Sequence, residues 1–487
     1  MARRTILLLV FGACLLAIPA GVSWAPVVGT RVTHIVSPPD ETPAANGQSD
    51  TDTFVEDRGG TRNDPTGGAR PADHNVTFSQ DNRKVKYVAY DSTATNLVSG
   101  DSNGKRDVFV MTRSHPGTGS TDGALSLGSV SSSGKQANGD SMKPSLDGVS
   151  TLGQKAGGVG CLAFQSKATN LDSSDKSSDW DIYLRNLKSH KTVLASPGKS
   201  NAKDGVVDGW CERVSFEAGG KVYVYDIARD DVTQVATGKD PDIQTNGQGV
   251  AFDHGGQVWY QALSHHGSKV EKDGGKRLVS NSAASKSKGG NGVSSDPNLN
   301  NDGLYVVFES KASDLCIHRC RGISEDRNGH TSDVFRRTMG KSPTGGPDEM
   351  EMVSYDGPTD TQGDLESDQV HVTGHGEQAV FRSFANNLRD IKFDHIAESG
   401  PFMHVYFWNF PRERLAGSIS GESKCCRDGE FHHNDMSAAF SFAPQISNRG
   451  TFIGFSSDEE SESGEKNGRG TVDAFIRFMG LGDEPGA

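Results

Sequence analysis

Short apolar runs separated by polar turns dominate the chain. Groups of β-branched and aromatic residues, such as Val88–Tyr90, alternate with clusters of Gly, Asp, Asn and Ser. Apolar positions spaced by three or four residues, which would predict long helices, are almost absent. This pattern is typical of many short β-strands joined by tight turns.

The apolar runs recur as a repeated pair of predicted strands. The first strand of each pair ends in an aromatic residue, with small or β-branched residues beside it, and this suits a strand packed between two sheets. These aromatic-ended strands are expected at 88–90, 162–164, 214–216, 250–252, 306–308, 379–381 and 453–455. Their partners are expected at 108–110, 182–184, 222–224, 258–260, 334–336, 405–407 and 474–476. The chain therefore contains seven copies of one unit.

Two further strands complete each unit. A segment ahead of the aromatic-ended strand is clear at 144–146, 241–243, 297–299 and 444–446, and Asp-Gly or Asn-Gly turns follow several of them. Closing strands are expected at 130–131, 195–196, 236–237, 279–280, 353–354 and 419–420. The seventh closing strand is missing from the end of the chain, but a matching segment lies at its start, Thr33–Ser37. We therefore predict an all-β closed propeller, in which the N-terminal strand completes the last blade.

The repeat also resembles a known family. Residues 90–97, 164–171 and 308–315 share an aromatic-x-Ser-x-Ala-Thr/Ser-Asn/Asp-Leu pattern, and Asp107, Asp181 and Asp333 each begin the next predicted strand. These units resemble the WD40-like repeat of TolB-type propellers. In units three, four and six, Lys221, Gln257 and His404 replace that Asp, so seven four-stranded blades are predicted and six remain possible.

The chain ends and a long polar stretch set the predicted domain organisation. Residues 1–25 combine Arg3-Arg4 with an apolar run and small residues, which predicts a signal peptide for either Sec or twin-arginine export. Residues 26–487 are then a single propeller domain without a transmembrane segment. Residues 38–74 are rich in Pro, Asp, Gly and Thr, and we interpret them as a mobile crossing.

Charge and cysteine content narrow the function classes. A formal charge of −13 argues against a nucleic-acid partner, because such binding requires a basic surface. Six cysteines remain after signal removal, an even number that favours disulfides over zinc in an exported chain. They are Cys161, Cys211, Cys316, Cys320, Cys425 and Cys426. Cys161 and Cys211 could pair across neighbouring blades, whereas the sequence leaves the other pairings open.

Two sets of acidic residues are candidates for binding. Asp101, Asn103 and Asp107 place oxygen ligands at alternate positions, as a calcium loop would, although such clusters are also ordinary turns. Four other residues are expected just before the innermost strands, so that they would meet at one mouth of the axial channel. They are Asp208, Asp240, Asp296 and Asp368. Such an acidic mouth would attract a cation or a basic peptide, and the alternative is a set of solvated turn residues.

These features lead to one main expectation of function. No motif in the sequence predicts catalytic residues or a bound cofactor beyond the calcium candidate. The TolB-like resemblance implies a rigid ring that presents loops and an axial mouth to protein or peptide partners in the cell envelope. We expect a non-catalytic, monomeric, secreted or envelope-located binding protein. The alternative is a secreted hydrolase of glycans or peptides with acidic residues at the channel mouth.

Overall fold

The computed structural model describes fifteen segments of the chain. They are 33–35, 76–79, 85–95, 97–116, 123–148, 160–265, 267–316, 326–340, 349–356, 361–385, 387–388, 404–410, 414–418, 441–457 and 473–478. The chain divides into units 1–30 and 31–487, and every described residue belongs to the second. The predicted signal peptide 1–25 and the crossing 38–74 lie outside these segments. No helix among the described residues is long and apolar enough to cross a membrane.

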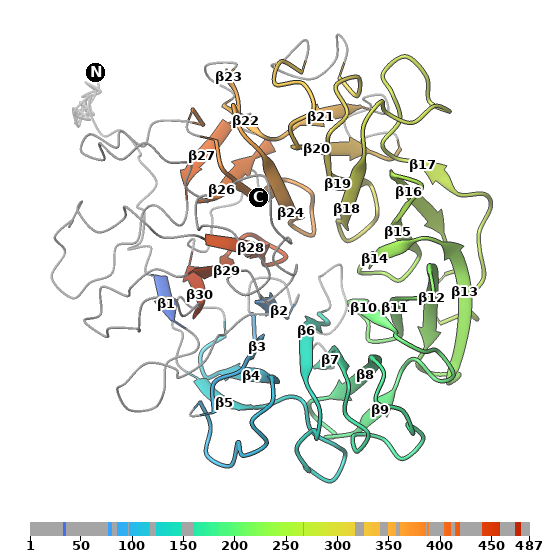
Figure 1. The fold of residues 1–487 in the computed structure, drawn as a ribbon, viewed down its shortest axis with the longest axis vertical. Coiled ribbons are helices and arrows are strands. Elements are labelled where there is room, and N and C mark those ends of the chain that lie inside the picture. Colours follow the sequence, from blue (N-terminus) through green and yellow to red (C-terminus); the bar gives the residue numbers. More distant parts are fainter. Residues whose placement is uncertain are drawn as a thin grey trace, which may run out of the picture. The chain divides into compact units, whose positions relative to one another are not determined.

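Seven four-stranded sheets account for most of the described strands (Figure 1). The first four, here called blades 1 to 4, are β2 (Thr77–Phe78), β3 (Tyr87–Ser92), β4 (Asp107–Arg113) and β5 (Gly123–Leu127); β6 (Ser141–Leu146), β7 (Cys161–Ser166), β8 (Asp181–Asn186) and β9 (Thr192–Leu194); β10 (Lys203–Val207), β11 (Arg213–Ala218), β12 (Lys221–Asp226) and β13 (Asp231–Thr237); and β14 (Lys239–Ile243), β15 (Gly249–His254), β16 (Gln257–Ala262) and β17 (Arg277–Leu278).

Blades 5 to 7 follow in chain order. They are β18 (Ser294–Leu299), β19 (Tyr305–Ser310), β20 (Asp333–Thr338) and β21 (Met350–Met352); β24 (Ser367–Val372), β25 (Gln378–Ser383), β26 (His404–Asn409) and β27 (Arg414–Ser418); and β28 (Ser441–Ile446), β29 (Phe452–Ser457), β30 (Asp473–Phe478) and β1 (Thr33–Ile35). A two-stranded sheet, β22 (Tyr355–Asp356) and β23 (Thr361–Gln362), lies between blades 5 and 6 in the sequence. The seven four-stranded sheets correspond to the seven repeat units counted in the sequence.

The N-terminal strand closes the ring, as the sequence predicted. β1 is antiparallel to β30, with Thr33 opposite Arg477 and Ile35 opposite Phe475. Each blade contacts the next one in the chain, and β2 of blade 1 contacts β28 of blade 7. The outer edge of the last blade is therefore covered by a strand from the other end of the chain.

The hydrophobic core lies mainly between neighbouring blades. One cluster joins Val108 and Val110 of blade 1 to Leu146 and Leu162 of blade 2, and another joins blades 2 and 3. The aromatic residues of the repeat form cross-strand pairs within the blades. In five blades, the ring centroids of these stacked pairs lie 5.6–5.9 Å apart: Tyr90–Phe109, Phe164–Tyr183, Phe216–Tyr223, Phe308–Phe335 and Phe381–Tyr406. The predicted aromatic-ended strands and their partners are thus confirmed.

The predicted closing strands need a small correction. The expected pair at 236–237 lies in β13, whereas those at 130–131, 195–196, 279–280 and 353–354 follow the outer strands, and 419–420 lies outside the described residues. The reason is a serine that leaves the strand ladder and turns back to the third strand of its own blade. In blade 5, Ser354 Oγ donates to Asp333 Oδ1 over 2.7 Å and accepts the Val334 N–H over 3.1 Å.

Candidate functional site

A channel is lined by the innermost strands of all seven blades. It encloses about 1060 Å³, open solvent included, and is lined by parts of β2, β6, β10, β14, β18, β24 and β28. Its lining includes Lys143, Asp204, Asp240 and Asp296, together with the buried carboxyl group of Asp242.

The inner strands share a backbone feature, and four of the residues that carry it line this channel. In blades 2 to 7, the pairing between the inner strand and its neighbour shifts at a β-bulge. Each bulge contains one non-glycine residue in the left-handed region, with φ between 46° and 53°. We call these the bulge residues: Lys143, Asp204, Asp240, Asp296, Gln369 and Ala443. Such a conformation costs energy for most side chains, so its recurrence marks a constrained position.

The bulges also connect neighbouring blades. The backbone N–H of Lys143 donates to Asp91 Oδ2 of blade 1 over 2.9 Å. In the same way, the Asp204 N–H donates to Gln165 of blade 2 and the Asp240 N–H donates to Glu217 of blade 3, both over 3.2 Å. The backbone at each bulge is therefore held by the preceding blade, which leaves the identity of the bulge side chain free to vary.

Three consecutive blades carry an aspartate at the bulge. Asp204, Asp240 and Asp296 come from blades 3, 4 and 5 and all line the channel. Carboxylate oxygens of Asp204, Glu217 and Asp240 lie within 4.8 Å of one another. We call Asp204, Asp240 and Asp296 the acidic arc. Burial, followed by the charges of Asp204 and Asp240, raises the pKa of Glu217.

Two lysines face the acidic arc. Lys143 Nζ lies 2.5 Å from Asp204 Oδ1, and Lys239 Nζ lies 2.8 Å from Asp240 Oδ2. The Lys239 side chain is 62% exposed, so its ion pair is open to solvent and contributes little to stability. Lysine ammonium groups thus already occupy positions beside the carboxylates, which shows that the arc accommodates cations.

Asp253 lies behind the acidic arc on β15. It is 3% exposed, and the backbone N–H of Asp296 lies within reach of its carboxyl group. The nearest cation is Lys239 Nζ, 3.9 Å from Asp253 Oδ2. Burial and the nearby charge of Asp240 raise the pKa of Asp253 to about 8. The carboxyl group of Asp253 therefore carries its proton in much of the population at neutral pH.

The four residues predicted at the channel mouth have different positions in the structure. Asp240 and Asp296 line the channel, although they lie within β14 and β18 rather than before them. Asp368 lies in β24, is fully buried, and pairs with Arg382, whose Nη2 is 2.5 Å from Asp368 Oδ2. Asp208 follows β10 instead of preceding an inner strand, so its predicted placement is wrong.

Asp208 has a local structural role instead. It is buried, and its Oδ1 accepts the backbone N–H groups of Glu212 and Arg213 over 2.8 and 3.2 Å. Burial raises the pKa of Asp208 to about 7. These bonds hold the turn between β10 and β11, which is the ordinary function of a short acidic side chain in a turn.

Asp204 and Glu217 are residues of the carboxylate cluster that were not predicted from the sequence. The sequence contains a pattern that could have located Asp204. In four inner strands a proline follows the bulge residue, namely Lys143, Asp240, Asp296 or Ala443. Aligning the repeats on that proline places Asp204 at the same position in blade 3, although Gly205 follows it. Glu217 could be found only through the register of β10 and β11, which places it opposite Lys203.

The calcium candidates form a hydrogen-bonded group in blade 1. The amide nitrogen of Gln136 donates to Asp101 Oδ1 over 2.8 Å and to Asp107 Oδ2 over 3.0 Å. Asn103 Nδ2 donates to the same Asp107 oxygen, and Ser129 Oγ donates to the other. Blade 5 repeats this arrangement, with Gln362 bonded to both Asp326 and Asp333. In both blades, amide and hydroxyl groups bind the carboxylates.

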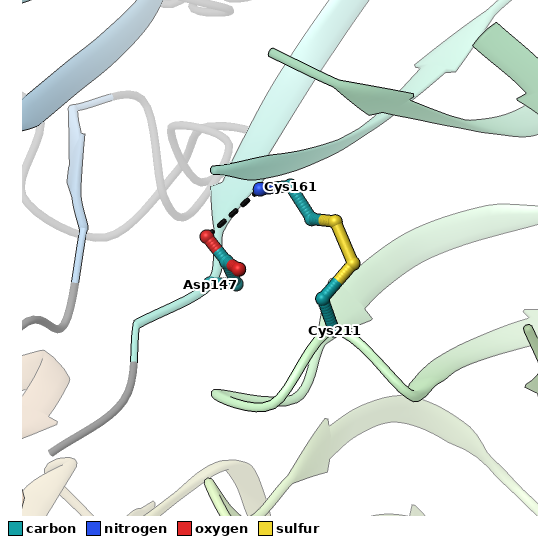
Figure 2. Close-up of side chains that lie close together, drawn as sticks. All are labelled: Asp147, Cys161 and Cys211. Carbon is teal, nitrogen blue, oxygen red and sulfur yellow. Dashed lines mark hydrogen bonds between the residues drawn. A yellow bond between two sulfur atoms is a disulfide. The ribbon is translucent and has the colours of Figure 1, made fainter. Parts of the chain in front are cut away.

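One disulfide joins blades 2 and 3. Figure 2 shows Cys161, at the start of β7, bonded to Cys211, in the turn before β11, with the Cα atoms 5.9 Å apart. Asp147 Oδ1 accepts the Cys161 N–H beside the bridge over 2.8 Å. The proposed Cys161–Cys211 pairing is therefore confirmed. Cys316 is also disulfide-bonded, while Cys320, Cys425 and Cys426 lie outside the described segments.

Comparisons with known proteins give similarities of fold only. No family model matches the sequence, and no curated protein matches it. Similar solved structures include the β-propeller domain of the trilobed protease from Pyrococcus furiosus, at 9% identity over 85% of this chain and 99% of that one, with a TM-score of 0.41. TolB from Acinetobacter baumannii is 9% identical over 92% of this chain and 96% of that one, with a TM-score of 0.35. An oligogalacturonate lyase in complex with manganese is 11% identical over 71% and 99%, with a TM-score of 0.30.

Proposed function

We propose that this chain is a non-catalytic, extracytoplasmic binding module whose channel receives a basic segment of a protein or peptide partner. The observation that supports it is the acidic arc, in which three consecutive blades direct Asp204, Asp240 and Asp296 into one cavity. Lysine and arginine side chains carry the complementary charge. The net charge of −13 would also speed the approach of such a partner.

The location outside the cytoplasm has separate support. Disulfides form and persist mainly in oxidising compartments, and the Cys161–Cys211 bridge agrees with the predicted export signal. We therefore place the binding event in the periplasm or outside the cell. The partner would be a protein with an extended Lys- or Arg-rich segment.

A peptide titration tests this function. A labelled hexalysine peptide is titrated with the purified full chain in EDTA, and hexaglutamate serves as the control ligand. We expect hexalysine to bind, and Asp240→Asn plus Asp296→Asn to weaken its binding about tenfold. The matched control, Asp231→Asn plus Asp273→Asn, removes the same charge from exposed positions on the outer part of blade 4 and its neighbour. Equal losses in the two double variants would contradict channel binding.

A second candidate function, hydrolysis, has one observation in its favour. Asp253 holds a proton near neutral pH beside Asp240, and a protonated and an ionised carboxyl group can act as general acid and base. Under this alternative the chain would cleave a glycan or peptide that enters the channel. Incubation with panels of both polymers, using Asp240→Asn as the inactive control, tests the idea. Cleavage by the wild-type chain and not by the variant would show that the chain is a hydrolase and would contradict the proposal of a non-catalytic binding module.

A further inference from the structure

The inner strands run in the same direction around the channel. In three pairs of neighbouring blades, the last N–H of one inner strand donates to the side chain of the next-to-last residue in the inner strand of the preceding blade. These bonds run from Val207 to Ser145, from Leu299 to Asp242 and from Val372 to Asn298, over 2.6–3.2 Å. The bulge residues therefore lie at one end of the channel, and the turns that follow the inner strands lie at the other end.

The turns at this second end are joined to one another. We call five of their residues the turn layer, and the first four of them line the channel: Gly209, Thr245, Asn301, Gly374 and Asn448. Backbone hydrogen bonds of 2.9–3.0 Å join Gly209 to Thr245, Asn301 to Gly374, and Gly374 to Asn448. The turn layer therefore links neighbouring blades around this end of the channel.

Side chains of the turn layer also reach across the end of the channel. Asn301 Nδ2 of blade 5 donates to Asn448 Oδ1 of blade 7 over 3.2 Å, so this bond skips blade 6. Thr245 Oγ1 of blade 4 donates to Asn301 Oδ1 over 2.6 Å. Gly374 of blade 6 lies beside this contact, and a Cβ atom there would clash with both asparagine side chains. Because side chains from blades 4, 5 and 7 meet here, the channel is constricted at the turn layer.

The length of the channel fits a short extended peptide. Five residue steps separate Asp240 at the bulge end from Thr245 in the turn layer. At about 3.3 Å per residue this is about 16 Å, which about five residues of an extended peptide would fill. An internal segment would have to enter as a hairpin, with two strands about 4.8 Å apart and their side chains. A single chain end is narrower, so it fits a channel that is constricted at its far end.

We propose that the turn layer acts as a stop, and that the channel receives the free amino end of the basic partner, which enters from the bulge end. The charged residues that line the channel include four aspartates and one lysine: Asp204, Asp240, Asp242, Asp296 and Lys143. This balance favours an α-ammonium group over an α-carboxylate, because opposite charges attract. The inference rests on the proposed binding function and identifies the part of the partner that binds.

Three fusions of one small folded carrier protein test the direction of entry. Hexalysine is joined to the amino end of the carrier, to its carboxyl end, or within an exposed loop, in each case through flexible Gly-Ser spacers of about ten residues. The three fusions have the same charge, and only the first presents the lysines at a free amino end. Each is titrated with the full, disulfide-bonded chain in EDTA by calorimetry. We expect the amino-end fusion to bind at least about tenfold more tightly than the other two.

A photo-reactive peptide locates the bound end. A residue with a diazirine side chain is placed before the first lysine of hexalysine, and in the matched control it is placed after the last lysine. After irradiation, mass spectrometry identifies the labelled residues of the chain. We expect the first peptide to label Thr245, Asn301 or their neighbours in the turn layer, and the control to label residues at the bulge end.

The outcomes separate this inference from the proposed function. Equal affinity of the amino-end fusion and either of the other fusions would overturn entry by the amino end, and so would labelling of the turn layer by the control peptide. If Asp240→Asn plus Asp296→Asn still weakened all three fusions in that case, the binding function would stand without it. If no fusion bound the wild-type chain, the binding function would fail together with this inference.

Discussion

Two sets of recurring aspartates in this propeller have opposite environments. The third-strand aspartates Asp107, Asp181 and Asp333 begin β4, β8 and β20, and each accepts a bond from the serine that follows its own outer strand. The acidic arc instead lies along the channel, where Asp204 and Asp240 pair with lysines.

The two sets of aspartates show that a repeated position can have either a structural role or a binding role in a repeat protein. In blades 1, 2 and 5 the third-strand position keeps an aspartate that accepts the serine bond, and in blade 4 Gln257 accepts the same bond from Ser280. In these blades the position is therefore part of how a blade is built. At the bulge, the backbone conformation is kept while the side chain changes from Lys143 to aspartate to Gln369 and Ala443. A constant backbone with a variable side chain indicates a position that is available for binding.

The largest expected effect comes from removing a third-strand aspartate. Asp333→Ala leaves the Ser354 hydroxyl without its buried acceptor and removes one of the two acceptors of the Gln362 amide, and should lower the free energy of unfolding by about 3 kcal/mol. Chemical denaturation measures this loss. Hexalysine affinity should stay unchanged. In contrast, Asp240→Asn should change stability by less than about 0.5 kcal/mol while reducing affinity. If Asp240→Asn lowered stability more than Asp333→Ala, the two sets of aspartates would not differ in role as described.

The pH dependence of stability gives an intermediate effect. Burial raises the pKa of Asp333 to about 7, above its value of about 4 in an unfolded chain. The folded state therefore holds a proton that the unfolded state has lost between these values. The stability from this group is complete below about pH 4 and is lost as the pH rises through 7. Thermal unfolding at pH 5 and pH 8 should show a smaller decrease in Asp333→Asn than in the wild type.

The smallest expected effect comes from the basic bulge residue. Lys143→Gln removes the positive charge beside Asp204 and should strengthen hexalysine binding two- to threefold, with no change at about 0.5 M salt because screening weakens all these charges. Fluorescence anisotropy at low and high salt measures this. Lys221→Gln, an exposed residue at the start of β12, is the matched control. A similar gain in the control would mean that total charge, rather than the channel, determines affinity.

Most of the fold could be predicted from local patterns. The aromatic-ended strands, their partners and the Thr33–Ile35 closure all follow from short-range periodicity and from counting strands. The outer strands were placed slightly late because their serines were read as strand residues. The sequence does not show that these serines bend back to bind Asp107, Asp181 and Asp333.

The candidate site was predicted only in part, for a physical reason. Asp240 and Asp296 were recognised because a turn-like polar residue at a repeated position is visible in the sequence. Asp208 and Asp368 looked equivalent, but one holds a turn and the other is buried against Arg382. Their roles depend on burial and charge pairing, which involve residues from other strands.

The sequence by itself therefore determined the blade architecture, because each blade is built from contacts between neighbouring strands of one repeat. Only the tertiary structure decided which carboxylates meet. Asp204, Glu217 and Asp240 lie on different strands of two blades, and their distances depend on the β-bulges and on the packing of one blade against the next. The chemistry of the channel arises at this level, because the electrostatic interaction of charges depends on their separation in space and on the surrounding solvent.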